Sequence, residues 1–324
     1  MTARGQLYCR LRQGWQPAQA YPCRLADRVL VADAPLAPLA PFAIAESSDP
    51  LPDRYTLLTE PGDIVCRSTG WLAGAWRNVA VWRHRQGLLL RVEGVGEFAV
   101  TTDGIAVIGP EVTPVAVAAL AEALLGAPLV LALALQGVWS LHASALSVDG
   151  QVIAFAGESG NGKSTLAACL NDAGQDGWRR VADDALPVSI EADGVVALPH
   201  FPQLKLTDVE QYPVDAPSSL PLAAVYVIGP QTAGQDSVSL QRLGQRQAMQ
   251  ALIRHTVAAR LFDQPLLAAH LDFCAEAAAR IPVWRLAHPH RREVLPQVCD
   301  AIHRSVSGSP AGSDSRVVIA HAGR

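Results

Sequence analysis

The sequence predicts an α/β protein in which a β-rich α+β half precedes a half of alternating strands and helices. Short apolar runs separated by Gly- and Pro-containing turns fill the first hundred residues. From Trp139 onward the pattern changes to strand, turn and helix. The composition agrees, because 50% of the 324 residues are hydrophobic and 17% are charged, as in folded globular proteins.

A β-rich N-terminal domain is expected over residues 1–112. Its predicted strands are Tyr55–Leu58, Val79–Arg83, Leu88–Val92, Glu97–Thr101 and Ile105–Ile108. The turns between them include Gly94-Val95-Gly96 and Asp103-Gly104, which favour hairpins. This half carries no catalytic motif, so substrate recognition is the hypothesis that remains for it.

Residues 113–137 are predicted to form a connector of two buried helices. The longest uninterrupted apolar run, Ala123–Leu135, has 13 residues, whereas a membrane span needs about 20. Gly126 breaks the pattern, and Pro128 suits the first turn of a second helix. The segment is therefore interpreted as core and not as a membrane anchor.

Residues 138–304 are predicted to form the catalytic domain, and residues 305–324, rich in Gly and Ser, a disordered tail. Strands are expected at Leu141–Val148, Gln151–Ala156, Trp178–Ala182, Val188–Ala192, Val195–Leu198, Ala223–Ile228 and Val283–Leu286. Helices are expected at Ser164–Asp172, Gln245–Arg260 and Leu266–Ala279. Asp149-Gly150 is a hairpin signal between the first two strands.

The most specific motif matches G-x-x-x-x-G-K-[ST] between a predicted strand and a predicted helix. It comprises Gly157, Glu158, Ser159, Gly160, Asn161, Gly162, Lys163 and Ser164, and Thr165 follows. Its glycines allow backbone N–H groups to surround phosphate at the positive end of a helix. Lys163 is expected to reach the β- and γ-phosphates of ATP, and the hydroxyl of Ser164 to bind Mg²⁺. Lys163 and Lys205 are the only lysines of the chain, which otherwise uses arginine.

An acidic pair, Asp183 and Asp184, lies 20 residues after Lys163 at the end of the next predicted strand. Ends of strands that run in the same direction meet at one edge of a sheet, so this pair is expected beside the phosphates. One carboxylate can accept a proton from an incoming hydroxyl, and the other can bind Mg²⁺ or position the loop. His142 begins the strand that precedes the loop strand.

This combination of a histidine, G-x-S-G-x-G-K-S and V-A-D-D resembles the catalytic domain of bacterial HPr kinase/phosphorylases, whose fold is similar to that of phosphoenolpyruvate carboxykinases. The resemblance covers roughly residues 138–290 and implies a mixed sheet. It further implies that Asp183 is the general base, that His142 supports it, and that Lys163 and Ser164 bind ATP and Mg²⁺. Members of the family often form oligomers, so a homo-oligomer is one option.

The chain departs from that family in lacking an L-E-I-R-G-L-G-I type segment. The corresponding Leu198–Leu206, with P-x-L-K-L, looks more like HPr-kinase-like proteins of ribosomal-peptide clusters, including lasso-peptide clusters. Members there phosphorylate a serine hydroxyl of a precursor peptide. Lys205, Arg254 and Arg260 are candidate contacts to phosphate or substrate, with ordinary surface charge as the alternative for each.

A net charge of −4 argues against nucleic acid or an anionic membrane as the main partner. The six cysteines contain no C-x-x-C pair, and the first residues lack the apolar core of a signal peptide, so the chain is expected to be cytoplasmic.

The resulting hypothesis is an ATP- and Mg²⁺-dependent phosphotransferase with a Ser or Thr hydroxyl of a peptide or protein as acceptor. Three alternatives stay open: a kinase of a small hydroxylated metabolite, an HPr(Ser) kinase, and a non-catalytic nucleotide-dependent regulator.

Overall fold

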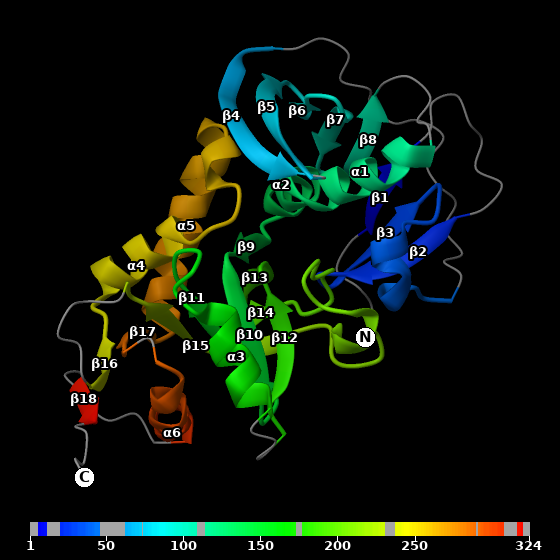
Figure 1. Cartoon of the computed structure of the whole chain (residues 1–324). Helices are drawn as coiled ribbons and strands as arrows, with labels where there is room; N and C mark the ends of the chain where they lie inside the picture. Colours follow the sequence, from blue (N-terminus) through cyan, green and yellow to red (C-terminus); the bar gives the residue numbers. More distant parts are fainter. Residues whose placement is uncertain are drawn as a thin grey trace. The chain divides into compact units, whose positions relative to one another are not determined.

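A computed structural model shows a mixed α/β protein with two mixed sheets, and it forms two compact units. It describes residues 6–11, 20–45, 62–72, 74–108, 114–172, 177–230, 237–289, 291–307 and 316–319. Unit 1 comprises Met1–Trp139, Pro213–Ser218 and Ala258–Ala269, and unit 2 comprises the remainder. Figure 1 labels the elements in chain order.

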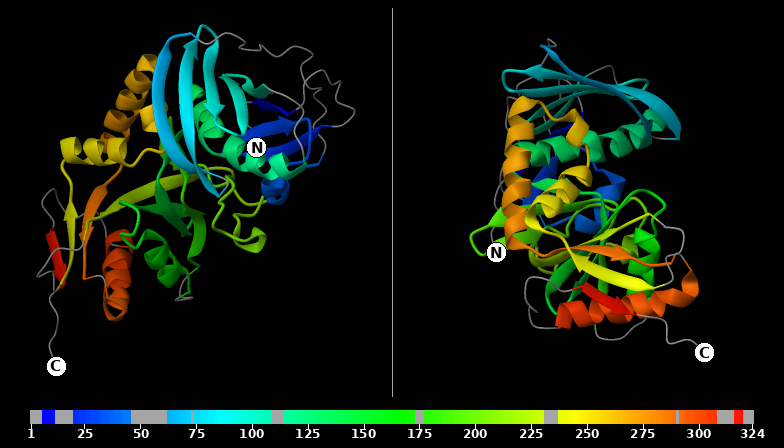
Figure 2. Two further views of the ribbon diagram at one scale, coloured as in Figure 1. Left: turned by 45° about the horizontal axis from the view of Figure 1, so that its top comes forward. Right: turned by 90° about the vertical axis from the view of Figure 1, so that its left-hand side faces the viewer.

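Unit 1 contains an eight-stranded sheet of order β2-β3-β1-β8-β7-β6-β5-β4. Its strands are β1 (Gln6–Arg10), β2 (Tyr21–Leu25), β3 (Arg28–Ala32), β4 (Ile64–Leu72), β5 (Ala75–His84), β6 (Gly87–Val92), β7 (Gly96–Thr101) and β8 (Gly104–Ile108). Strand β1 is parallel to both neighbours, and the other pairs are antiparallel. The long strands β4 and β5 curve visibly in Figure 2.

The predicted elements of this unit are largely confirmed. Hairpins join β6 to β7 and β7 to β8 at the turns that the sequence indicates. The helices α1 (Pro114–Leu125) and α2 (Ala127–Leu135) break at Gly126, and α2 packs on β7 and β8. The predicted strand Tyr55–Leu58 lies outside the described residues. Two short 3-10 helices also belong to the unit, η1 (Ala37–Phe42) and η3 (Ala259–Leu261).

Unit 2 is built on a sheet in which neighbours follow the order β12-β10-β11-β15-β17-β16-β18. Its strands are β9 (Trp139–Leu141, with Trp139 counted in unit 1), β10 (Ala143–Val148), β11 (Gln151–Ala156), β12 (Arg179–Asp183), β13 (Leu186–Glu191), β14 (Gly194–Ala197), β15 (Leu220–Ile228), β16 (Val238–Arg242), β17 (Val283–Ala287) and β18 (Arg316–Ile319). Strand β10 is antiparallel to both β11 and β12, so these two run in the same direction and end at the same edge. Strands β11, β15 and β17 are parallel.

Two of the helices of this unit, α3 (Lys163–Asp172) and α6 (Leu295–Ser307), pack on the sheet in its hydrophobic core. The other helices are α4 (Gln245–Arg254) and α5 (Gln264–Arg280, whose residues to Ala269 belong to unit 1), with 3-10 turns η2 (Asp208–Glu210) and η4 (Arg292–Val294). Leu166 and Leu170 of α3 and Ile302 of α6 pack with Phe155 and Tyr226 of the central strands, all fully or almost fully buried. This packing fixes the start of α3 at the end of β11.

Three sequence predictions require correction. The strand predicted over Leu141–Val148 is two strands, because His142 interrupts it. The helix predicted to Arg260 ends at Arg254, since the next residues pair with β9: Thr256 bridges Leu141. In the tail predicted to be disordered, α6 continues to Ser307, and the β-branched run in Arg316–Ile319 forms β18 against β16.

None of the helices in the described part of the chain combines the length and the apolar character that crossing a bilayer requires.

Candidate functional site

A glycine-rich loop joins β11 to α3, as the motif predicts. Gly160 and Gly162 have φ angles of 86° and 89°, in the left-handed region that side chains other than glycine rarely adopt. The Asn161 side chain donates to the carbonyl of Ile228 at 3.1 Å and ties the loop to β15. The loop therefore places a helix N-terminus at the carboxyl edge of the sheet, an arrangement suited to an anion.

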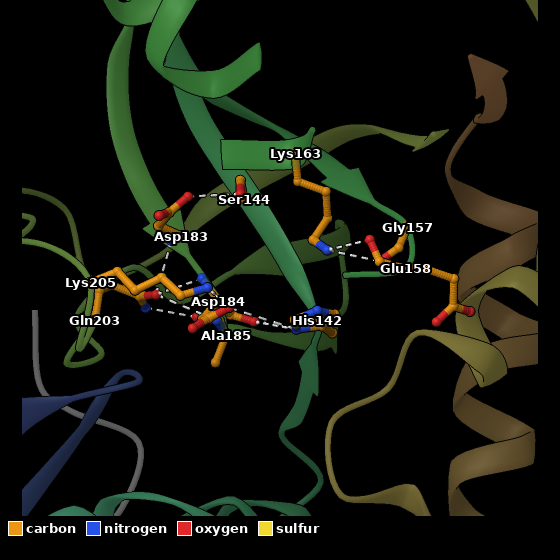
Figure 3. Close-up of polar contacts among 10 residues, drawn as sticks. All are labelled: His142, Ser144, Gly157, Glu158, Lys163, Asp183, Asp184, Ala185, Gln203 and Lys205. Atoms are coloured by element: carbon orange, nitrogen blue, oxygen red, sulfur yellow. Dashed lines mark hydrogen bonds and ion pairs between the residues drawn. The ribbon is translucent and has the colours of Figure 1, made fainter. Parts of the chain in front are cut away.

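Lys163 begins α3 and folds back into this loop (Figure 3). Its Nζ donates to the carbonyl oxygens of Gly157 at 2.8 Å and Glu158 at 3.2 Å. The side chain is buried, and burial lowers the pKa of its ammonium, an effect that the nearby Asp184 opposes. A buried ammonium whose hydrogen bonds go to neutral carbonyl groups favours a negatively charged ligand.

Asp183 is the last residue of β12 and lies next to the start of β10. It is only 5% exposed, and its Oδ1 accepts a hydrogen bond of 2.8 Å from the hydroxyl of Ser144. In the register of β10, Ser144 pairs with Asp183 on one side and with Phe155 of the loop strand on the other. The carboxylate and the loop are thus one strand apart at the same edge.

Asp184 faces a different set of side chains. The ammonium of Lys205 forms an ion pair of 2.8 Å with its carboxylate. The Nδ1 of His142 lies 3.2 Å from the backbone oxygen of Asp184 and 4.0 Å from its carboxylate. Burial, followed by the charge of Lys163, lowers the pKa of His142. The imidazole of His142, which was expected to support Asp183, contacts Asp184.

The remaining candidates are divided between the two units. Arg254, at the end of α4, forms an ion pair with Glu158 of the loop, with 2.8 Å between Nε and Oε1, and this hydrogen bond lowers the pKa of Glu158. Arg260 belongs to unit 1, where its guanidinium lies 3.5 Å from the carbonyl of Thr69. The ion pair with Glu158 places Arg254 at the border of the loop. Ser159 and Thr165 are exposed on the loop and at the start of α3.

Two residues of the site were missed from sequence. Ser144 is one of two serines, with Ser147, in a strand whose other residues are apolar, and a hydroxyl at a buried position of such a strand is a signal that could have identified it. Gln203 is the variable residue of the P-x-L-K-L segment, and its side chain contacts the backbone of Asp183 and Asp184.

The part of the chain that the structure describes offers few protein ligands for a metal ion. Within the described residues, no group of three or more His, Cys, Asp and Glu side chains is placed to hold one. Mg²⁺ at a nucleotide needs less, because it takes one or two protein ligands and fills its octahedron with phosphate oxygens and water. Ser164, in the first turn of α3, and the half-exposed carboxylate of Asp184 fit that requirement.

Comparisons with known proteins add little to this geometry. No family model matches the sequence, and no curated protein matches it either. Among solved structures, the Hpr(Ser) kinase/phosphatase from Coxiella burnetii matches with 14% identity and a TM-score of 0.28, over 51% of this chain and 89% of that chain. The case for function therefore depends on the residues of the site.

Proposed function

We propose that the protein is an ATP- and Mg²⁺-dependent kinase that transfers the γ-phosphate to a serine or threonine hydroxyl of a peptide or protein. One observation carries the proposal. A glycine-rich loop with a buried lysine follows β11, and a buried carboxylate, Asp183, ends β12; these two strands flank β10 and end at one edge of the same sheet. A nucleotide sensor needs the loop, but it has no use for the buried carboxylate.

The residues of the chain divide the work of the reaction. The loop amides and Lys163 hold the triphosphate and offset the charge that spreads over the transferred group. Bound Mg²⁺, with Ser164 and Asp184 as its protein ligands, would supply further positive charge to the phosphate oxygens. Asp183 accepts the hydroxyl proton while the acceptor oxygen bonds to the γ-phosphorus, the bond to the bridging oxygen breaks, and ADP leaves.

The acceptor class rests on a sequence resemblance. The segment Pro202–Leu206 resembles that of kinases which phosphorylate a precursor peptide, and it contributes Lys205 beside Asp184. Lys205 is paired with Asp184, Arg254 is paired with Glu158 of the loop, and both cations are exposed, so they are our candidates for contacts with substrate phosphate or peptide. A ribosomally made peptide with an acceptor serine is the proposed substrate.

Phosphate transfer from γ-labelled ATP tests the proposal directly. The protein is incubated with Mg²⁺ and, separately, with a serine-ended precursor peptide, HPr and a pool of hydroxylated metabolites. We expect label on the peptide, and loss of that label in Asp183→Asn. The matched control is Asp193→Asn, the same change in an exposed turn between β13 and β14.

Other outcomes would replace parts of the proposal. Label on HPr or on a metabolite alone would change the acceptor and keep the kinase. Normal transfer by Asp183→Asn would remove this residue as the base. ATP binding without any transfer or hydrolysis would favour a nucleotide-dependent regulator.

A further inference from the structure

Gln203 makes an unusual set of contacts with the turn that carries both carboxylates. Its side-chain oxygen accepts hydrogen bonds from three consecutive backbone N–H groups, those of Asp183 at 3.0 Å, Asp184 at 3.2 Å and Ala185 at 3.4 Å. Figure 3 shows the amide directed at this turn. Successive N–H groups that converge on one point form a backbone nest, a geometry that proteins often use for anions. Here a neutral side-chain oxygen from the same chain fills it.

The other end of the same amide is also fully engaged. Nε2 of Gln203 donates to the carbonyl oxygens of Ala185 at 2.7 Å and Phe201 at 3.2 Å. Because the oxygen faces only donors and the nitrogen faces only acceptors, a single orientation of the amide satisfies both. The side chain is 3% exposed, so water cannot replace these bonds readily.

Gln211 fixes Gln203 in turn. The backbone N–H of Gln203 donates to Oε1 of Gln211 at 3.1 Å, and Nε2 of Gln211 donates back to the carbonyl of Gln203 at 2.8 Å. Nε2 of Gln211 also donates to the carbonyl of Leu206 at 3.2 Å. The buried side-chain amide of Gln211 thus holds the backbone of the loop that carries Gln203.

We propose that Gln203 is a positioning residue for phosphate transfer, which holds the Asp183–Ala185 turn so that the carboxylate of Asp183 stays at the edge beside the loop. The inference rests on the proposed function of Asp183. The Ser144 hydroxyl holds only the carboxylate, whereas Gln203 holds the backbone from which both carboxylates project. A supporting contact of this kind matters because displacements of about 1 Å can reduce a rate by roughly 100-fold.

Two substitutions of similar size separate positioning from bulk stability. Gln203→Met removes the oxygen acceptor and keeps the length, and Gln203→Glu keeps an acceptor for the three N–H groups. With ATP, Mg²⁺ and the labelled acceptor, we expect Gln203→Met to lower kcat about 10- to 100-fold, since it disturbs the position of the base. The KM for ATP should change less than kcat, because Lys163 and the loop amides, which hold the triphosphate, are untouched. Gln203→Glu should recover part of the loss, because a protonated carboxyl group accepts from the three N–H groups and donates to one of the two carbonyl oxygens.

The matched control is Gln151→Met, an exposed position at the far end of β11 from the loop. Wild-type kcat in folded Gln203→Met, equal losses in the Met and Glu variants, or a loss confined to ATP affinity would each overturn the inference.

Hydrogen exchange of the amides of residues 183–185 is the second readout, and it does not need activity. We expect exchange at least about tenfold faster in Gln203→Met than in the wild type, because the amides lose their acceptor. Unchanged exchange would overturn the inference even in a protein that transfers phosphate. If the wild type transfers no phosphate to any acceptor, the proposed function fails, and the exchange result still decides whether Gln203 holds the turn.

Discussion

Replacement of Ser144 by alanine is the sharpest stability test of the site. The substitution leaves the buried Asp183 without the hydroxyl that donates to Oδ1 at 2.8 Å. A hydrogen bond to a charged group contributes about 1.5–3 kcal/mol. Its loss here leaves the carboxylate of Asp183, which is 5% exposed, without this donor. We therefore expect Ser144→Ala to lower the free energy of unfolding of unit 2 by about 1.5–3 kcal/mol at pH 7.

Ser147 provides the matched control within the same strand. It also bonds across to β12, but it does so over 3.4 Å, in an exposed position and to the neutral carbonyl of Arg179. Ser147→Ala should therefore cost less than about 0.5 kcal/mol. Urea unfolding followed by hydrogen exchange of residues 143–156 reports on this sheet without interference from unit 1.

A double-mutant cycle with Asp183→Ala, which removes the acceptor oxygen, then isolates the pair. Two results would contradict this reasoning: a loss in the free energy of unfolding for Ser144→Ala that is no larger than that for Ser147→Ala, or a coupling energy of zero in the cycle. Either would show that the hydrogen bond between Ser144 and Asp183 does not contribute to stability.

Three further predictions test the loop and a buried histidine. Lys163→Ala should weaken ATP binding by about 1.5–3 kcal/mol, or roughly 10- to 150-fold in Kd by calorimetry, because it removes a charged donor to phosphate; an unchanged Kd would contradict the loop assignment. Gly160→Ala should cost about 1–2 kcal/mol in unfolding experiments, because a Cβ there has open space and only the positive φ is strained; Gly229→Ala, also in open space and without a positive φ, should cost less. Burial lowers the pKa of His270, so the unfolded chain binds more protons than the native protein as the pH falls through about 6.5, and stability present above that pH is lost below it. His270→Gln should reduce the loss in urea midpoint between pH 7.5 and 5.5, and the same loss as in the wild type would rule out His270 as a source.

Local features of the fold could be predicted because neighbouring residues determine them. Asp149 and Gly150 have φ angles of 48° and 74°, as a two-residue hairpin turn requires, and the sequence signal is confined to those two positions. The loop from Gly157 to Ser164 is likewise one contiguous segment, whose glycines permit the backbone and whose lysine follows at a fixed offset.

Where the helix after Gln245 ends was not predictable in this way. Its pattern continues to Arg260, but Val257 donates its N–H to Ser140 of a strand more than a hundred residues earlier. Competition between a helix and a distant strand depends on tertiary packing, which propensity along the chain does not contain.

Sequence by itself thus determined the chemistry available at the site: a phosphate-type loop, a lysine, and a pair of carboxylates after the next strand. Tertiary structure alone decided how they are paired. The register of β10 and β12 brings Ser144 to Asp183. The segment after β14 places the side-chain amide of Gln203 against the turn that begins at Asp183. The physical reason is burial. Once packing removes Asp183 and its backbone from water, each polar atom needs a partner at hydrogen-bond distance, and the residues that provide it are chosen by proximity in space and not by spacing along the chain.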